Sequence, residues 1–277
     1  DPSTHPVIEG NTIGESRAGG ILTFRGASAL VRNNTVRATA AANVRLADGT
    51  TARLEGNTIR DGDDCGVAVC SGARCVLADN TICGHHKKAG VLVYGAQTAP
   101  TLLRNVIEGS DQAGVYFYAG AQGVVEDCEL RANKGPNVII AEGSHPLVSK
   151  CTIHSSDDAG VLVHQDGKGT LEQNNVYNNR TFGVVVLTGG CSLIRANWLH
   201  GRRQGGLLVD EGGACEVREN KIEGNSKAGV TLRGACQPHI HHNQIYDGRD
   251  SGIHALEGGG GTIELNDVYG NERAGIG

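Results

Sequence analysis

The sequence repeats one asparagine at a nearly constant interval from end to end. Successive copies are 23 residues apart, except for a single step of 25. The column comprises Asn11, Asn34, Asn57, Asn80, Asn105, Asn174, Asn197, Asn220, Asn243 and Asn266, with Cys128 and Cys151 in the two remaining copies. A period of this length is typical of a solenoid, because one unit cannot bury its apolar side alone and stacks on its neighbours.

Apolar residues within each copy predict three short strands. Leu54 lies three residues before Asn57 and Ile59 two residues after it. These offsets differ in parity, and because a strand keeps one face at a period of two, the chain must turn at the Asn. A third segment, such as Gly-Val-Leu-Val at 90–93, begins ten residues after each Asn. The sequence has no apolar pattern at the α-helical period of 3.6 residues. It therefore predicts an all-β parallel β-helix of about twelve 23-residue coils, with three short strands per coil.

Two columns of the repeat carry structural expectations. We expect the Asn side chains to point inward at a coil corner and to hydrogen bond to the coils above and below. A glycine precedes the third strand in most copies and is replaced by Asn at 43 and 137. Because Asn follows Gly in tolerating positive φ, we interpret this column as a left-handed turn residue. Its glycines are Gly66, Gly90, Gly114, Gly160, Gly183, Gly206, Gly229 and Gly252.

The single 25-residue step carries two extra residues, one on each side of the third strand. The segment 85–88, His-His-Lys-Lys, holds one, and the segment 97–99 holds the other. Loops absorb insertions that strands cannot. We therefore expect both to bulge at the corners while strand pairing at Val91 persists.

The unbroken repeat predicts one domain over residues 1–277. Both ends of the sequence fall inside a copy, and solenoids need polar caps over their end layers, so we expect a piece of a longer protein. No apolar run is long enough to span a membrane, and no membrane partner is expected. The net charge of −5 without long basic runs disfavours nucleic acid as a partner.

The nine cysteines lack CxxC pairs and zinc-ligand spacing. We expect small buried thiols and a reducing compartment. Cys128 and Cys151 lie one coil apart, a spacing that suits a disulfide and two stacked thiols equally. His239, His241 and His242 are interpreted as exposed strand residues, although Glu216 or Glu264 on adjacent coils would allow adventitious metal binding. We expect neither a metal site nor a cofactor.

A column of alternating charge admits two interpretations. Six residues after the repeat position, successive coils carry Asp111, Lys134, Asp157 and Arg180. One interpretation is a surface ion-pair ladder that sets coil register. The other is a catalytic cluster, in which a carboxylate abstracts a proton beside a uronate carboxyl and the cations stabilise the developing charge. The pairs at 63–64 and 157–158 also resemble the paired Asp of pectin-degrading hydrolases, but the companion motifs of those enzymes are absent.

The outward side of the third strand is apolar over six consecutive coils. A strand face in contact with water should carry mostly polar residues, as the outward positions two residues before each Asn do. The contrast between these two outward columns predicts a binding surface on the third strand. The candidate ligand-binding residues are Leu92, Tyr94, Tyr116, Tyr118, Ile139, Leu162, His164, Val185, Leu208 and Asp210. A protein segment or a polysaccharide would bind there; alternatively, a missing terminal segment or a second copy of the chain covers this face.

The repeat Asn-x-Ile-x(7)-Gly-Val-x-Val resembles a known family. Segments such as 238–248 and 169–180 carry the likeness to the β-helix repeats, called carbohydrate-binding and sugar-hydrolase domains, of F-box only protein 11-like and NosD-like proteins. This resemblance implies a right-handed helix and a non-catalytic recognition domain, as in a substrate-recognition module of a ubiquitin ligase. The alternative it leaves open is a polysaccharide lyase, epimerase or hydrolase acting through the charged column. The Tyr-Gly-x-Asp-Pro-His motif of alginate epimerases is absent.

Overall fold

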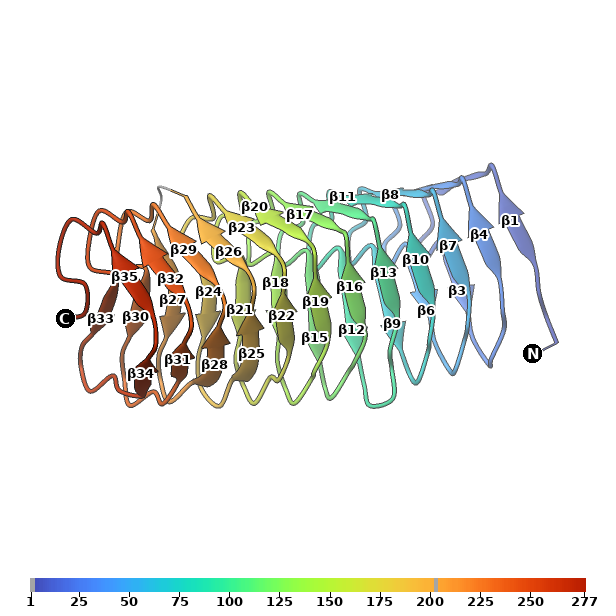
Figure 1. The fold of residues 1–277 in the computed structure, drawn as a ribbon. Helices are drawn as coiled ribbons and strands as arrows, with labels where there is room; N and C mark the ends of the chain where they lie inside the picture. Colours follow the sequence, from blue (N-terminus) through green and yellow to red (C-terminus); the bar gives the residue numbers. More distant parts are fainter. Residues whose placement is uncertain (1–2, 202–203) are drawn as a thin grey trace.

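The computed structural model describes residues 3–201 and 204–277, which wind into a solenoid of three parallel sheets. The strands of each sheet follow one another along the long axis, and the two termini lie at opposite ends (Figure 1). The predicted parallel β-helix is therefore confirmed, with two twelve-stranded sheets and one eleven-stranded sheet over the described residues.

Each coil contributes one strand to each sheet in turn. Sheet A comprises β1 (Val7–Glu9), β4 (Leu30–Arg32), β7 (Arg53–Glu55), β10 (Val76–Ala78), β13 (Thr101–Leu103), β16 (Val124–Glu126), β19 (Leu147–Ser149), β22 (Thr170–Glu172), β25 (Cys191–Arg195), β28 (Ala214–Arg218), β31 (His239–His241) and β34 (Thr262–Glu264). Sheet B comprises β2 (Thr12–Gly14), β5 (Thr35–Arg37), β8 (Thr58–Arg60), β11 (Thr81–Cys83), β14 (Val106–Glu108), β17 (Glu129–Arg131), β20 (Thr152–His154), β23 (Asn175–Tyr177), β26 (Trp198–His200), β29 (Lys221–Glu223), β32 (Gln244–Tyr246) and β35 (Asp267–Tyr269). Sheet C comprises β3 (Ile21–Thr23), β6 (Val44–Leu46), β9 (Val67–Cys70), β12 (Val91–Tyr94), β15 (Val115–Tyr118), β18 (Val138–Ile140), β21 (Val161–Val163), β24 (Phe182–Val186), β27 (Gly205–Val209), β30 (Val230–Leu232) and β33 (Ile253–Ala255).

The core is a thin column of aliphatic layers inside the three sheets. The middle side chain of each three-residue strand in sheets A and B points inward, as Leu77 and Ile82 do, and the five-residue strands β25 and β28 each bury two side chains. Each inner strand of sheet C also supplies two, as Val67 and Val69 do. Phe117 on β15 is the largest fully buried side chain. Because equivalent residues pair between coils, each layer rests on similar side chains above and below.

The Asn column forms the predicted ladder at the corner between sheets A and B. The Oδ1 of Asn57 accepts hydrogen bonds from the backbone N–H and Nδ2 of Asn34, at 3.0 and 3.1 Å. Its own Nδ2 donates to the Val31 carbonyl and to Asn80 Oδ1, both at 2.9 Å. The amides therefore satisfy backbone groups that the corner would otherwise bury without partners.

Cys128 and Cys151 continue the ladder as free thiols. The sulfur of Cys128 accepts the backbone N–H of Asn105 at 3.3 Å, and the sulfur of Cys151 donates to the Ser149 carbonyl at 3.2 Å. A hydrogen bond from the Cys151 thiol lowers the pKa of Cys128, and the same contact raises that of Cys151. Of the two arrangements that the spacing allowed, the structure contains the stacked thiols.

The interpretation of the glycine column as left-handed is wrong. None of these glycines has positive φ; instead, a Cβ at Gly229 would lie 2.8 Å from the carbonyl oxygen of Gly252 on the next coil. The column is glycine because coils approach closely there. Left-handed residues do occur at the corners, where Arg104, Lys150 and Leu265 have φ of 52, 54 and 53°, immediately before the ladder position. Arg, Lys and Leu are not typical of positive φ, so the sequence did not indicate these left-handed positions.

Substitution of Gly229 by Ala should lower the free energy of unfolding by about 1–3 kcal/mol, because the added methyl would displace the neighbouring backbone. Gly260→Ala is a matched control, since its Cβ would lie 3.5 Å from the nearest atom, on Gln237. Urea denaturation of both variants measures the difference. Equal stability of the two variants would contradict the close-approach explanation.

A second polar column occupies the corner between sheets B and C. The Oδ1 of Asn133 accepts the Ser110 N–H at 2.9 Å, and that of Asn179 accepts the Ser156 N–H at 3.1 Å. The signal was present in the sequence, because Asn133, Asn179, Asn225 and Asn271 recur every second coil. Sequence reasoning missed it because the intervening coils carry other residues.

The 25-residue step behaves partly as predicted. Val91 still pairs with Val67 on one side and Val115 on the other, so the insertions leave the strand in register. His85, however, does not join a surface bulge. It is fully buried in the second polar column, and only residues 86–88 are exposed.

Within the described residues, no helix is long and apolar enough to cross a membrane.

Candidate functional site

The outer face of sheet C carries a second, smaller apolar cluster. It includes Leu92 and Ile139, each 7% exposed, with Tyr94, Tyr116, Tyr118 and Leu162 packed against them. The sequence predicted that this column faces outward, which is correct, and that it is open, which holds only for part of it. Small residues before the strands, among them Ala42, Ala89 and Ala113, belong to the same cluster and help to cover the aliphatic side chains.

Three tyrosines form a platform at the centre of this face. Tyr94 and Tyr118 are paired on adjacent strands, and their rings stack with centroids 5.1 Å apart and an interplanar angle of 16°. Tyr116 lies on the same strand as Tyr118, and its ring is tilted by 43° at 5.1 Å. Burial raises the pKa of all three, that of Tyr94 to about 12. The hydroxyls therefore remain protonated at neutral pH and can donate hydrogen bonds.

A pocket of about 270 Å³ adjoins the platform towards the N-terminal end of the sheet. Tyr94 and Leu92 form part of its wall, and Arg45, Lys88 and Asp64 place charges at its rim. Lys88 and Asp64 form an ion pair at 2.9 Å, and the hydrogen bond from Lys88 to Asp64 raises the pKa of the lysine. The pocket thus combines an aromatic wall with two cations and one carboxylate. Sequence reasoning noted Asp64 only within the pair at 63–64 and missed the grouping, because the three charges come from three different coils.

Among the described residues, the charged column forms a single ion pair. Asp111 and Lys134 lie 2.6 Å apart on the corner that precedes β15 and β18. Asp157 and Arg180 form no ion pair within the part of the chain that the structure describes. The four residues therefore line one corner beside the apolar face but do not make a continuous ladder.

The remaining candidate residues differ in exposure and in whether they are already hydrogen bonded within the fold. His164 is half-buried, and burial lowers its pKa although Glu142 opposes the shift. Val185 is 7% exposed, while Leu208 on β27 is half-buried. Asp210 is bound within the fold: Arg233 donates to it at 2.7 Å and lowers its pKa, and the Glu211 N–H donates to it at 2.7 Å.

A family model described as the right-handed β-helix region matches residues 2–107, 89–243 and 185–277. The chain belongs to the right-handed β-helix family. Among curated proteins, the sequence has no match.

Solved right-handed β-helices share the fold at low sequence identity. The A-module of Azotobacter vinelandii mannuronan C-5 epimerase AlgE4 is 12% identical with a TM-score of 0.63, over 99% of this chain and 88% of that one. The AlgE6 A-module is 16% identical with a TM-score of 0.62, over 98% and 80%. Pectate lyase Pel9A is 12% identical with a TM-score of 0.55, over 90% and 72%. At these identities the comparison establishes the architecture of this β-helix.

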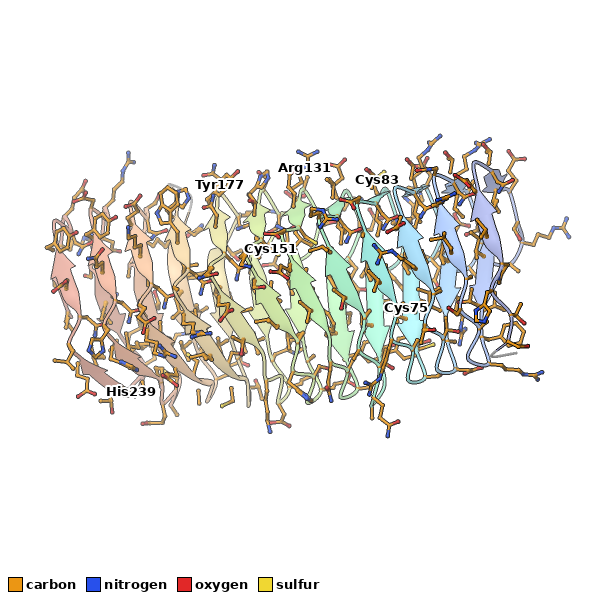
Figure 2. The ribbon with its side chains drawn as sticks, turned by 45° about the vertical axis from the view of Figure 1, so that its right-hand side comes forward. Cys75, Cys83, Arg131, Cys151, Tyr177 and His239 are labelled. Atoms are coloured by element: carbon orange, nitrogen blue, oxygen red, sulfur yellow. The ribbon has the colours of Figure 1, made fainter. Side chains whose placement is uncertain are left out.

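The histidines of β31 are engaged with carboxylates on neighbouring strands. His239 lies 2.9 Å from Glu264, and His241 lies 3.5 Å from Glu216. In the described part of the β-helix, no three His, Cys, Asp or Glu side chains are grouped so that they could hold a metal ion. Figure 2 shows His239 on the opposite side of the molecule from the row of Cys83, Arg131 and Tyr177 on sheet B.

Proposed function

We propose that this β-helix binds an acidic polysaccharide along the outer face of sheet C. The observation that supports the proposal is the stacked platform of Tyr94 and Tyr118 beside a pocket rimmed by Arg45 and Lys88. A sugar ring has an apolar face that packs on an aromatic ring and polar edges that need hydrogen-bond partners. The protonated tyrosines supply donors, and the two cations would pair with uronate carboxylates.

A peptide is the weaker occupant of the same face. Sheet C is continuous from β3 to β33 over the described residues, so an extended peptide finds few unpaired backbone groups within it and would depend on side-chain contacts. The F-box resemblance gains no support from the structures compared above, and the proposal does not include it. The similar epimerase modules and pectate lyase bear names that refer to polysaccharide chemistry, which agrees with a glycan ligand.

Replacing Tyr94, Tyr116 and Tyr118 together with Leu should abolish polyuronate binding. Leucine keeps the apolar cover over the cluster but removes the flat rings and the hydroxyl donors, so the thermal unfolding midpoint should stay within a few degrees. Calorimetric titration with oligogalacturonate and oligomannuronate measures the binding. Tyr177→Leu on sheet B is the matched control and should bind normally. Undiminished binding by the triple variant would refute the site.

A second candidate function is modification of the bound uronate. Asp111 and Lys134 stand as a carboxylate–ammonium pair at the corner beside the platform, with Asp157 and Arg180 on the next two coils. A carboxylate there would abstract the proton next to the uronate carboxyl, and the cations would stabilise the resulting negative charge. Incubation with polyuronate, followed by ultraviolet absorbance for unsaturated products and NMR for inversion at C5, tests this function. Binding without either product would assign the face to recognition alone.

A further inference from the structure

Four aromatic rings form a continuous stack on the outer face of sheet B. His154 and Tyr177 have ring centroids 4.8 Å apart with an interplanar angle of 1°, and Tyr177 and His200 follow at 5.1 Å. His200 in turn stacks on Trp198 at 4.0 Å. Asn175 fixes the His200 ring through a contact of 2.8 Å. From His154 to His200 the stack follows successive strands along the solenoid axis, whereas Trp198 lies on the same strand as His200. Figure 2 shows Tyr177 within the row of outward side chains.

Trp198 ends this stack and keeps one ring face free. It is the only tryptophan of the sequence and is 42% exposed, unusual for the largest apolar side chain. One face packs on His200, and the ring lines a depression of about 380 Å³ together with Lys221, Glu223 and Tyr246. The free face is therefore directed towards β29.

Tyr246 forms the opposite wall of the depression. Its ring is stacked on Tyr269 with centroids 5.0 Å apart and an interplanar angle of 3°, so only the face towards β29 is open. A hydrogen bond with Glu223 raises the pKa of Tyr246 to about 12 and holds the ring in place. Two aromatic rings, one from β26 and one from β32, thus line the same depression over β29.

Trp198 and Tyr246 border the depression diagonally. β26 and β32 are two strands apart in sheet B, and Trp198 is in register with Lys221 and Gln244, whereas Tyr246 is in register with Glu223 and His200. Lys221 and Glu223 form the floor, and a second depression of about 420 Å³ beyond Glu223 extends the trough towards Asp247 and Arg249. Lys221 has no ion-pair partner among the described residues.

We propose that this trough is a second glycan site, which binds a neutral polysaccharide by packing its sugar rings against Trp198 and Tyr246. A pyranose ring presents an apolar face to an aromatic side chain and hydroxyls to the charged floor. An aromatic side chain of a protein would also fit the depression but would bury the Lys221 ammonium without a partner, at a substantial cost. The four carboxylates around the trough, Glu219, Glu223, Asp247 and Glu272, outnumber its two cations, Lys221 and Arg249, which disfavours a uronate.

This site does not rest on the function proposed for sheet C. The two surfaces belong to different sheets and use different residues, so each can fail alone. The sheet B site prefers a neutral ligand, whereas the sheet C site prefers an acidic one.

The single tryptophan provides a direct readout. Titration of the intact protein with cellohexaose, mannohexaose and xylohexaose should produce a saturable change in Trp198 fluorescence with at least one of them, and oligogalacturonate should produce none at equal concentration. Tyr246→Ala and Glu223→Gln should each weaken this response by about tenfold, the effect of losing one good contact. The triple Leu variant on sheet C is the matched control and should respond like the unaltered protein.

Calorimetry completes the test, because Trp198→Ala has no fluorescence signal. This variant should lose binding of the neutral hexaose and keep binding of the uronate. The proposal is overturned if none of the three neutral hexaoses changes the fluorescence, if an aromatic peptide such as a Phe-rich hexapeptide does so instead, or if Tyr246→Ala binds unchanged.

Discussion

Asn57→Leu should lower the free energy of unfolding by roughly 3–6 kcal/mol. Leucine has a similar size but cannot replace the hydrogen bonds that Asn57 makes with Asn34, Val31 and Asn80. The Asn34 N–H would then be buried without a partner, at about 1–3 kcal/mol, and the Val31 carbonyl, the Asn34 Nδ2 and the Asn80 Oδ1 would each lose one hydrogen bond, worth about 0.5–1.5 kcal/mol. Poorer packing of leucine against the Asn side chains of the coils above and below adds to the loss of stability. Denaturation in urea, monitored by circular dichroism, measures the change.

Two companion variants test the explanation. Asn11→Leu makes the same change at the exposed first rung and should cost less than about 1 kcal/mol, because water can satisfy the released groups. Asn57→Cys should fall between the two leucine variants, since Cys128 and Cys151 already serve as rungs with weaker sulfur hydrogen bonds. If Asn57→Leu were as mild as Asn11→Leu, the ladder would not be a source of stability.

The second large effect concerns acid. His85 is fully buried, and neither ring nitrogen has a hydrogen-bond partner among the described residues. Burial lowers its pKa to about 4, which the Ile59 carbonyl and Asp61 only partly oppose. The unfolded chain binds a proton at this residue near pH 6.5, so the unfolded state gains protons first as the pH falls. The contribution of the neutral His85 to the free energy of unfolding is therefore fully present above about pH 6.5. It is lost as the pH falls from about 6.5 to about 4, and the loss is roughly 3 kcal/mol at 1.36 kcal/mol per pH unit.

His85→Asn should remove this part of the acid sensitivity. Asparagine occurs in the same column at 133 and 179, so the corner accommodates it. Stability curves at pH 7 and pH 4.5 for the two proteins isolate the histidine, because other titrating groups are common to both. The exposed neighbour supplies the control: His86→Asn should keep the full acid sensitivity. A parallel pH dependence of the His85→Asn variant and the unaltered protein would show that His85 is protonated in the fold.

Features that recur in every coil were predictable from the sequence, and features that occur in a single coil were not. The parallel strands and the ladder through Asn57 were predictable, because the residues that form them recur at the same position of nearly every coil. Stacked coils then repeat the same contacts. The close-packed glycines, such as Gly229, were located but misinterpreted. Their spacing shows that glycine is required, whereas the reason, a carbonyl of the next coil at 2.8 Å, is a contact between coils.

The candidate site on sheet C was predicted in part. Alternation along a strand is a local property, and it correctly assigned Leu92 and the three tyrosines to one outer face. How far they are covered depends on corner residues such as Ala89 and Ala113, whose contribution comes from neighbouring coils. The stacking of Tyr94 on Tyr118 follows from register once coils are aligned. The pairing of Lys88 with Asp64 occurs because opposite charges stand at the same repeat position of two adjacent coils, where other copies carry other residues.

The sequence by itself determined the architecture of this protein: the period, the number of strands per coil, the inward aliphatic layers and the Asn ladder. These features are encoded within one coil and repeated. Tertiary structure alone decided which irregular residues meet, namely the buried His85, the pocket at Arg45 and Lys88, and the trough between Trp198 and Tyr246. Such sites form where copies differ from the repeat, and only the stacking of the coils brings those differences together.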